Sequence, residues 1–286
     1  DNTAPITSLN IAGPLYIKDG IRHITPESGL TFASADPLVS EVSAGIERIE
    51  TAVDGGQWLK YTQALKFNEG RHTVKYRAID NVGNMETERV LEVWSDATAP
   101  ESRWLAASGP WIEKDNKFYL NALGSIALES ADPVRNNVAS GLENIYYGID
   151  AVPAIKYAAA FNLAEGVRTV NYSAKDNVGN TALVKSMVVY VDGTKPVTAL
   201  SLSGDQYKDD KQYISRRTDI IITAVDPAVN NVAVGIKETK YSVDGEAFAN
   251  YTLFKLSAEG KRLVSYYSTD FVANIETVKT AALWVD

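Results

Sequence analysis

The sequence predicts an all-β chain made of three tandem β-sandwich domains, and three observations carry this prediction. The pentapeptide DNVGN at residues 80–84 returns as DNVGN at 176–180 and as DFVAN at 270–274. Between these motifs, apolar and polar residues alternate with a period of two, as they do in half-buried strands. Polar segments that contain proline separate the copies, as expected for linkers.

The three copies keep one register over the whole chain, with the motif spaced by 96 and then 94 residues. The other marks in this register are Thr3, Thr98 and Thr194 of the opening segments; Asp36, Asp132 and Asp226; Gly45, Gly141 and Gly235; and Tyr61, Tyr157 and Tyr251. Self-similarity at a fixed period identifies a supersecondary unit that is used several times. The predicted domains are residues 1–96, 97–192 and 193–286.

Within the first copy, three strands can be placed in order. Residues 30–34 form the first, with its apolar side chains on one face. Residues 49–53 form the second, which ends at the turn signal Asp-Gly-Gly of residues 54–56. Residues 73–78 form the third, and the other two copies repeat all three patterns. About seven such strands in each copy of roughly 95 residues are typical of an immunoglobulin-like sandwich.

The composition is that of an ordinary folded chain. Of the 286 residues, 45% are hydrophobic and 22% are charged, and no apolar run approaches the ~20 residues of a membrane-spanning helix. The formal net charge of −8 argues against nucleic acid as a partner, because phosphates require a basic face. The absence of cysteine excludes disulfides and thiolate metal sites. Residues 1–5 have the composition of a linker, so we expect a fragment of a longer chain.

The order of these marks resembles a known class of repeat. A Thr-Ala-Pro start, Gly45-Ile46 nine positions after Asp36, and Tyr-Arg-x-x-Asp-Asn-x-Gly-Asn at residues 76–84 are similar to the bacterial Ig-like repeats of large secreted and cell-surface proteins. Related repeats are labelled outer-membrane barrel repeats. The resemblance covers all three copies and implies export and a role as stalk, spacer or adhesive module. It implies no defined ligand.

We expect the chain not to be an enzyme. It contains two histidines, His23 and His72, and the position of His72 holds Arg168 and Arg262 in the other copies. A Ser-His-Asp arrangement needs three groups that converge, and no nucleophile motif accompanies these histidines. Metal-ligand spacings such as His-Glu-x-x-His are also absent.

Calcium is the predicted cofactor, if any, at the poles of the domains. Asp36 and Asp80 continue the inward-facing positions of their strands, and the incoming linker adds Asp1 in the first copy, so these carboxylates should meet at one pole. Crowded carboxylates repel one another unless a cation or donors satisfy them, and Ca²⁺ takes 6–8 oxygen ligands. The candidate metal ligands are Asp36, Asp80, Asn81, Asp96, Asp132, Asp176, Asn177, Asp192, Asp226 and Asp270.

The same residues also fit a purely structural role. Aspartate and asparagine bond their own backbone in tight turns, and Gly83 can supply a positive φ. The third copy has Phe271 and Ala273 where the others have asparagine and glycine, which weakens the case for Asn81 as an essential ligand. Calcium binding and turn chemistry both stay open on the sequence.

Aromatic residues suggest glycan stacking as a second kind of binding. Trp104 and Trp111 belong to the middle copy alone, and an exposed pair could contact the face of a sugar ring. By contrast, Trp94, Tyr190 and Trp284 share one position late in the last strand of each copy, which indicates packing at the end of the domain.

The sequence therefore favours a non-catalytic extracellular or cell-surface module, a stalk, spacer or adhesive segment of a bacterial surface protein. The alternative is a carbohydrate-binding accessory region of a secreted enzyme. The expected partners are neighbouring repeats of the same chain and a surface protein or glycan. We expect no nucleic acid and no membrane insertion within this segment.

Overall fold

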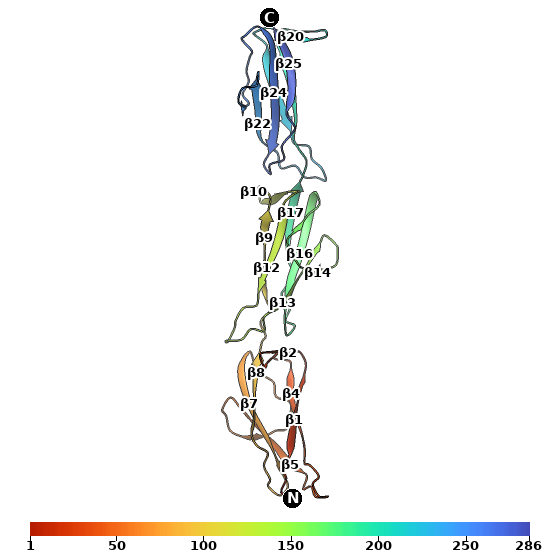
Figure 1. Ribbon diagram of the computed structural model, residues 1–286, viewed down its shortest axis with the longest axis vertical. Coiled ribbons are helices and arrows are strands. Elements are labelled where there is room, and N and C mark those ends of the chain that lie inside the picture. Colours follow the sequence, from red (N-terminus) through yellow and green to blue (C-terminus); the bar gives the residue numbers. More distant parts are fainter. The chain divides into compact units, whose positions relative to one another are not determined.

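The computed structural model describes residues 1–286 and is all-β, with β1–β25 and no helix (Figure 1). Three six-stranded sheets are each accompanied by a smaller sheet of two or three strands. Every sheet is built from strands of a single repeat, so the chain folds as three tandem Ig-like β-sandwiches, as predicted. No helix is present that could span a bilayer.

Repeat 1 consists of β1 (Ile6–Ala12), β2 (Leu15–Lys18), β3 (Ile21–Ile24), β4 (Gly29–Ala35), β5 (Ile46–Val53), β6 (Leu59–Lys60), β7 (Gly70–Asp80) and β8 (Arg89–Ser95). The small sheet pairs β1 with β4, and the large sheet has the order β2-β3-β8-β7-β5-β6. Neighbours are antiparallel except β3 and β8, which run parallel. The end of β4 and the end of β7 therefore both lead into loops beside the start of the repeat.

Repeat 2 consists of β9 (Glu101–Ser108), β10 (Trp111–Lys114), β11 (Lys117–Asn121), β12 (Ser125–Ala131), β13 (Leu142–Ile149), β14 (Ile155–Lys156), β15 (Phe161–Asn162), β16 (Gly166–Asp176) and β17 (Lys185–Asp192). Its sheets have the orders β15-β12-β9 and β10-β11-β17-β16-β13-β14. As in repeat 1, the second strand of the short hairpin runs parallel to the last strand of the repeat, here β11 beside β17.

Repeat 3 consists of β18 (Val197–Ser203), β19 (Gln206–Lys208), β20 (Gln212–Ile214), β21 (Asp219–Val225), β22 (Ile236–Val243), β23 (Ala249–Asn250), β24 (Gly260–Asp270) and β25 (Lys279–Val285). The small sheet pairs β18 with β21, and the large sheet has the order β19-β20-β25-β24-β22-β23. Its topology therefore repeats that of the first sandwich strand for strand.

The core of each sandwich is formed by the alternating residues that the sequence pattern predicts. In repeat 1, Leu30 and Phe32 of β4 pack in one apolar cluster with Val74 and Tyr76 of β7. Equivalent clusters or equivalent buried positions occur in the other repeats, namely Ile126, Leu128, Val170 and Tyr172, and Ile220, Ile222, Val264 and Tyr266. Because side chains alternate between the faces of a strand, each of these strands contributes every second residue to the core.

The strand count differs from the prediction of about seven, because repeats 1 and 3 have eight strands and repeat 2 has nine. In each repeat, two of these strands form a short hairpin that the sequence analysis did not place. In repeat 1 this hairpin joins β2 to β3 through Asp19 and Gly20, both with positive φ (50° and 80°). Two consecutive positive φ angles are the requirement of a two-residue hairpin turn of type I′. The Asp-Gly pair was the signal that could have located it.

The chain divides into two compact units, and each contains one complete repeat with part of the middle one. The first unit comprises Asp1–Arg103, Glu129–Tyr146 and Tyr172–Val184; the second comprises Trp104–Leu128, Tyr147–Asn171 and Lys185–Asp286. The junction of repeats 1 and 2 belongs to the first unit, and that of repeats 2 and 3 to the second. Because the units do not follow the repeats, the predicted boundaries 1–96, 97–192 and 193–286 stay predictions.

Residues 97–192 expressed alone should fold as an all-β domain, because every strand partner of β9–β17 lies within this segment. Far-ultraviolet circular dichroism with a cooperative thermal transition is the measurement. An unstructured segment, with the whole chain folded under the same conditions, would show that the repeats are not independent domains.

Candidate metal centre

The structure gathers the predicted aspartates into three clusters, one at the start of each repeat. Each cluster combines an aspartate of the incoming linker, one that follows the strand β4, β12 or β21, and the last residue of β7, β16 or β24. The clusters are Asp1, Asp36 and Asp80; Asp96, Asp132 and Asp176; and Asp192, Asp226 and Asp270. In each one, ligand oxygens of the three residues lie within 4.8 Å of one another.

The linker aspartate ties the start of the repeat to the loop that precedes β13 in the middle copy. Asp96 Oδ2 accepts a hydrogen bond of 2.6 Å from the backbone amide of Ser140, and Asp96 Oδ1 accepts one of 3.0 Å from that of Thr98. In the same loop, the amide of Gly141 donates to Asp132 Oδ2 at 2.7 Å. Corresponding pairs of bonds form at the first and third clusters. The loop is thus held by carboxylates on both sides.

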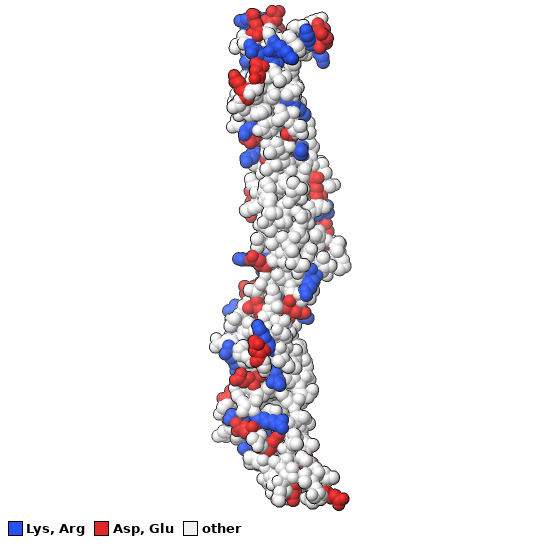
Figure 2. Space-filling view, viewed as in Figure 1, with Lys and Arg blue, Asp and Glu red and all other residues white.

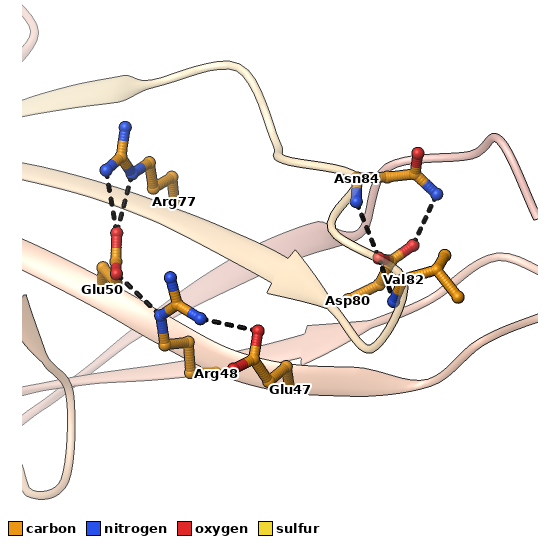
Figure 3. Close-up of polar contacts among 7 residues, drawn as sticks. All are labelled: Glu47, Arg48, Glu50, Arg77, Asp80, Val82 and Asn84. Atoms are coloured by element: carbon orange, nitrogen blue, oxygen red, sulfur yellow. Dashed lines mark hydrogen bonds and ion pairs between the residues drawn. The ribbon is translucent and has the colours of Figure 1, made fainter.

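The third aspartate of each cluster organises a tight turn, which is the structural role that the sequence left open. Figure 3 shows this turn in repeat 1, where Asp80 Oδ1 accepts hydrogen bonds from the amides of Val82 (3.0 Å) and Asn84 (2.8 Å). The Asn84 side-chain amide donates to Asp80 Oδ2 at 2.7 Å. Gly83 has a φ of 94°, and Ala273 holds the same left-handed conformation with a φ of 63°. Turn chemistry at this motif is therefore confirmed.

These bonds leave one carboxylate oxygen unpaired at the same place in every repeat. Asp36 Oδ1, Asp132 Oδ1 and Asp226 Oδ1 are buried and have no hydrogen-bond partner. A buried polar atom without a partner is destabilising, and the cost is greater for a charged group. Turn chemistry does not account for this oxygen, whereas a cation or a proton would satisfy it.

In repeats 2 and 3, burial disfavours ionisation of the clustered carboxyl groups. In repeat 1, burial also acts to raise the pKa of Asp80, but the hydrogen bonds from Asn84, Val82 and Gly83 outweigh it and the pKa is lowered. Burial raises the pKa of Asp132 to about 6, opposed by the hydrogen bond from Gly141 and reinforced by the charges of Asp96 and Asp176. Burial likewise raises the pKa of Asp192 to about 6. Burial also raises the pKa values of Asp176, Asp226 and Asp270.

The third cluster has a basic neighbour whose charge acts on one of its aspartates. Lys114, at the end of β10, donates a hydrogen bond of 2.8 Å from its ammonium nitrogen to the carbonyl oxygen of Val234. Its positive charge lowers the pKa of Asp226, against the larger opposite effect of burial. Lysine supplies part of the neutralising charge at this cluster, so the three clusters are unequal.

Asn81 and Asn177, the predicted amide ligands, hold the loop instead of facing a carboxylate. The side-chain amide of Asn81 donates to the carbonyl oxygen of Ala44 at 2.8 Å. That of Asn177 donates to the carbonyl oxygens of Ser140 (2.9 Å) and Gly141 (2.8 Å). Their role as metal ligands stays a prediction, while Asn84 and its equivalents contact the carboxylate directly.

At the opposite end of each repeat, the hairpin missed by the sequence analysis forms what we call the tail face. Three side chains from the hairpin and from the last strand make up this face, and their rings lie 5.2–6.4 Å apart where all are aromatic or histidine. The three tail faces are Tyr16, His23 and Trp94; Ile112, Tyr119 and Tyr190; and Tyr207, Tyr213 and Trp284. The expectation that residues 94, 190 and 284 pack at the domain end agrees with these contacts.

The tail face of repeat 2 packs directly against the start of repeat 3. Tyr119 belongs to one apolar cluster with Val232, Val234 and Val272, which lie in the loops before β22 and after β24. Asn121 adds hydrogen bonds to the carbonyl oxygen of Val272 (2.9 Å) and to Asn274 Oδ1 (2.8 Å). The cluster of aspartates therefore borders an apolar junction.

The junction of repeats 1 and 2 uses the same positions with more polar residues. His23 is buried, and burial lowers the pKa of its imidazole. Arg71 donates from Nε to the carbonyl oxygen of Asn137 at 2.8 Å, and its guanidinium lies 4.0 Å from the centre of the Trp94 ring. His23 thus belongs to the tail face of repeat 1, where its ring packs against those of Tyr16 and Trp94.

His72, the second histidine of the chain, contacts the turn after β5. His72 bonds to Asp54 Oδ2 at 2.8 Å and to the carbonyl oxygen of Asn68 at 2.9 Å. Arg168 makes the equivalent ion pair with Asp150 in repeat 2. This position therefore anchors the turn after β5 or β13 by a basic side chain of either type.

Trp104 and Trp111 are brought together around one ring. The centre of the Phe118 ring lies 4.8 Å from that of Trp104 and 5.5 Å from that of Trp111. Trp111 keeps 52% of its surface exposed, and Trp104 lines a shallow hollow with Glu113 and Lys117. Trp111 thus offers an exposed aromatic surface, with the half-buried Trp104 and polar groups beside it.

Comparisons with known proteins find no matching family model and no matching curated protein. Among solved structures, the fibronectin(III)-like modules of Clostridium thermocellum CbhA are 11% identical, with 66% of this chain and 95% of that chain covered and a TM-score of 0.34. Extracellular cadherin domains 1–4 of protocadherin gamma B7 are 11% identical, with 93% and 74% covered and a TM-score of 0.30. The Bacteroides ovatus glucan-utilisation protein SGBP-B, solved with a mixed-linkage heptasaccharide, is 11% identical, with 97% and 70% covered and a TM-score of 0.19. At these scores we base no argument on the likeness.

Without divalent cations, the chain should become less stable as the pH rises from about 4 to about 7 through the raised pKa of Asp132. The folded state then binds more protons than the unfolded state, so this contribution is present below the unfolded value and is lost above about 6. His23, whose pKa is lowered, acts in the opposite direction. The difference between wild type and Asp132→Asn isolates the carboxyl group.

Thermal melts in EDTA at a series of pH values provide the measurement. The midpoint of Asp132→Asn should exceed that of the wild type by a few degrees at pH 7 and match it near pH 4, since about 1 kcal/mol moves the midpoint of a domain of this size by about 4–8 °C. Glu101→Gln, an exposed carboxylate on β9, is the control. A constant difference at all pH values would contradict the raised pKa.

Proposed function

We propose that this chain is a non-catalytic extracellular module of tandem Ig-like repeats, a stalk or spacer with adhesive capacity from a bacterial surface protein, in which Ca²⁺ bound at the aspartate clusters ties each repeat to its linker. The observation that carries the metal proposal is the recurrence, in all three repeats, of three converging aspartates with one buried and unpaired oxygen.

The donor set fits a hard divalent cation. All three residues of each cluster offer carboxylate oxygens, which Ca²⁺ prefers over nitrogen or sulfur ligands. Asp96, Asp132 and Asp176 would hold the ion in the middle repeat, where the charges of Asp96 and Asp176 both act on Asp132. The bound ion would supply positive charge that offsets the repulsion among the carboxylates.

Backbone donors already orient these carboxylates, so little reorganisation would accompany binding. Asp96 and Asp132 are fixed by amides of the loop at Ser140 and Gly141, and Asp176 by its own turn. A cation at this point would therefore connect a linker and two loops. Restraint of a linker between repeats is the property that a stalk or spacer needs.

The assignment to a cell surface is supported by the sequence resemblance to bacterial Ig-like repeats and by the repetition itself. Three copies that keep the same loops and turns but vary their surface residues suit a spacer better than a chemical centre. Extracellular Ca²⁺ sites of modules bind at ~10⁻⁴–10⁻³ M. At a free concentration of ten times the dissociation constant, one site would add about 1.4 kcal/mol to the folded state.

Carbohydrate binding by an accessory region of a secreted enzyme is the second candidate. It is favoured by Trp104 and Trp111, which flank Phe118 beside Glu113 and Lys117. An aromatic face contacts the apolar face of a sugar while nearby polar groups bond its hydroxyls.

Titration with Ca²⁺ should shift the backbone amide resonances of Val178 and Asn180, whose N–H groups donate to Asp176. Asp132→Asn should abolish these shifts in the middle repeat and leave those of Val272 and Asn274, beside Asp270, unchanged. Nitrogen–proton correlation spectra of the whole chain are the measurement.

The unaffected third cluster serves as the control within the same molecule, and Mg²⁺ tests the selectivity for the larger cation. Absence of shifts in the wild type at 10 mM Ca²⁺, roughly ten times the weakest expected dissociation constant, would leave the aspartates with turn chemistry alone.

If the tryptophan pair binds glycans, Trp111→Ala should weaken retention on a polysaccharide affinity gel by at least about tenfold, the effect of about 1.4 kcal/mol of lost stacking. Leu123→Ala, at an exposed apolar residue of the same repeat, is the control. Equal migration of wild type and Trp111→Ala on every polysaccharide tried would remove this candidate.

A further inference from the structure

The turn after β24 differs from its equivalents at one position that bonds the loop before the neighbouring strand. In repeat 2, the side-chain amide of Asn177 fills this position and donates to the carbonyl oxygen of Ser140 at 2.9 Å, and Asn81 makes the equivalent bond in repeat 1. Repeat 3 has Phe271 here, whose side chain has no N–H group. The corresponding carbonyl oxygen, that of the buried Val234, therefore needs another donor.

Lys114 of the preceding repeat supplies this donor. Its ammonium nitrogen donates to the carbonyl oxygen of Val234 at 2.8 Å and lies 4.5 Å from the centre of the Phe271 ring. A cation over the face of an aromatic ring is attracted by the ring's quadrupole. The residue that removes the amide thus also helps to hold the ammonium group that replaces it.

The ammonium group lies in the same place beside the loop as the amide of repeat 2. Gly141 and Gly235 mark this place, with φ angles of 85° and 91°. A Cβ atom added to Gly141 would lie 3.3 Å from Nδ2 of Asn177, and one added to Gly235 would lie 3.4 Å from Nζ of Lys114. The loop therefore keeps its conformation at this glycine while the group beside it changes from neutral to charged.

One peptide group connects the ammonium group to the aspartate cluster. Its carbonyl oxygen belongs to Val234 and accepts from Lys114, and its N–H belongs to Gly235 and donates to Asp226 Oδ2 at 2.6 Å. Hydrogen bonds in such a chain polarise one another, so the positive charge strengthens the donor that faces the carboxylate. Burial raises the pKa of Asp226, and the charge of Lys114 acts in the opposite direction.

We propose that Lys114 sets the cation affinity of the third cluster, because it places a fixed positive charge where repeat 2 has a neutral amide. This inference rests on the proposed function, since it concerns the same Ca²⁺ sites. The ammonium group would repel a bound cation, and carboxylates that it already stabilises would gain less from binding one. The third cluster should therefore bind Ca²⁺ more weakly than the second.

The lysine at the same position of the first hairpin is placed differently. Lys18 is exposed, whereas Lys114 is partly buried. The carbonyl oxygen of Ser140, which corresponds to that of Val234, accepts from Asn177. Water and salt screen an exposed charge more than a buried one, so Lys18 should affect the second cluster less than Lys114 affects the third. One range of Ca²⁺ concentration would then fill the second cluster and leave the third with its lysine.

Two variants of Lys114 separate its charge from its hydrogen bond. Lys114→Gln keeps a neutral donor near the loop and removes the charge, while Lys114→Arg keeps the charge. The whole chain is titrated with Ca²⁺ and followed by nitrogen–proton correlation spectra. The amides of Val178 and Asn180 report on the second cluster, and those of Val272 and Asn274 report on the third.

In the wild type, half-saturation of the third cluster should require a Ca²⁺ concentration at least about tenfold higher than that of the second, a difference of about 1.4 kcal/mol. Lys114→Gln should lower the concentration for the third cluster at least about tenfold and leave the second unchanged. Lys114→Arg should keep the wild-type values. The double variant Lys114→Gln with Phe271→Asn restores the arrangement of repeat 2 and should bind as Lys114→Gln does.

Lys261→Gln is the control for net charge. Lys261 is exposed and lies at the start of β24, at the other end of this strand from Asp270. Basic and acidic side chains are interspersed on the face shown in Figure 2, and solvent screens such exposed charges. Lys261→Gln should therefore leave the half-saturation of both clusters at the wild-type values.

The titration separates a failure of this inference from a failure of the proposed function. If Val178 and Asn180 do not respond to Ca²⁺ in the wild type, the proposed function is wrong and the inference falls with it. If they respond, but Lys114→Gln leaves the third cluster unchanged or weakens it, only the role of Lys114 is wrong. Tighter binding in Lys114→Arg, equal to that in Lys114→Gln, would likewise overturn the role of the charge.

Discussion

Three carboxylates crowded together at the start of each repeat, two of them buried in repeats 2 and 3, form the constraint on which the arrangement of loops depends. Their repulsion and their loss of hydration oppose folding, so the surrounding backbone must supply compensating donors. The loop before β13 does so with the amides of Ser140 and Gly141, and the turn after β16 does so with those of Val178 and Asn180. Satisfying the charges therefore fixes the linker and both loops together.

The compensation is incomplete at one oxygen in each repeat, and this deficit separates a structural turn from a cation site. A turn needs acceptors only for its own amides, and Asp176 meets that need without Asp132. The unpaired Oδ1 of Asp132 adds negative charge where no amide reaches it. In repeat 3, Lys114 offsets part of the corresponding charge, so the same backbone carries clusters of different electrostatic balance.

The two junctions show how one geometry accepts different chemistry. At the second junction Tyr119 meets Val234, an apolar contact that excludes water from both side chains. At the first, His23 and Ser140 hold those positions, and His23 Nδ1 and Ser140 Oγ are buried without hydrogen-bond partners. Because unpaired polar atoms offset the gain from burial, the first junction gains less from packing than the second. Arg71, bonded to Asn137 and stacked on Trp94, supplies polar contacts there instead.

The sequence by itself determined the repeat, the all-β class, the inward residues of the main strands and the approach of Asp36 to Asp80. Each of these follows from local rules, since alternation fixes which side chains share a face and two strand ends of equal direction share a pole. The tertiary structure alone decided what lies across a gap in sequence. The hairpin of β2 and β3 becomes part of the large sheet only by pairing with β8, a parallel contact that no local pattern announces. The burial of Val138 was also decided by the tertiary structure, because it lies in the loop that Arg71 of the preceding repeat contacts at Asn137.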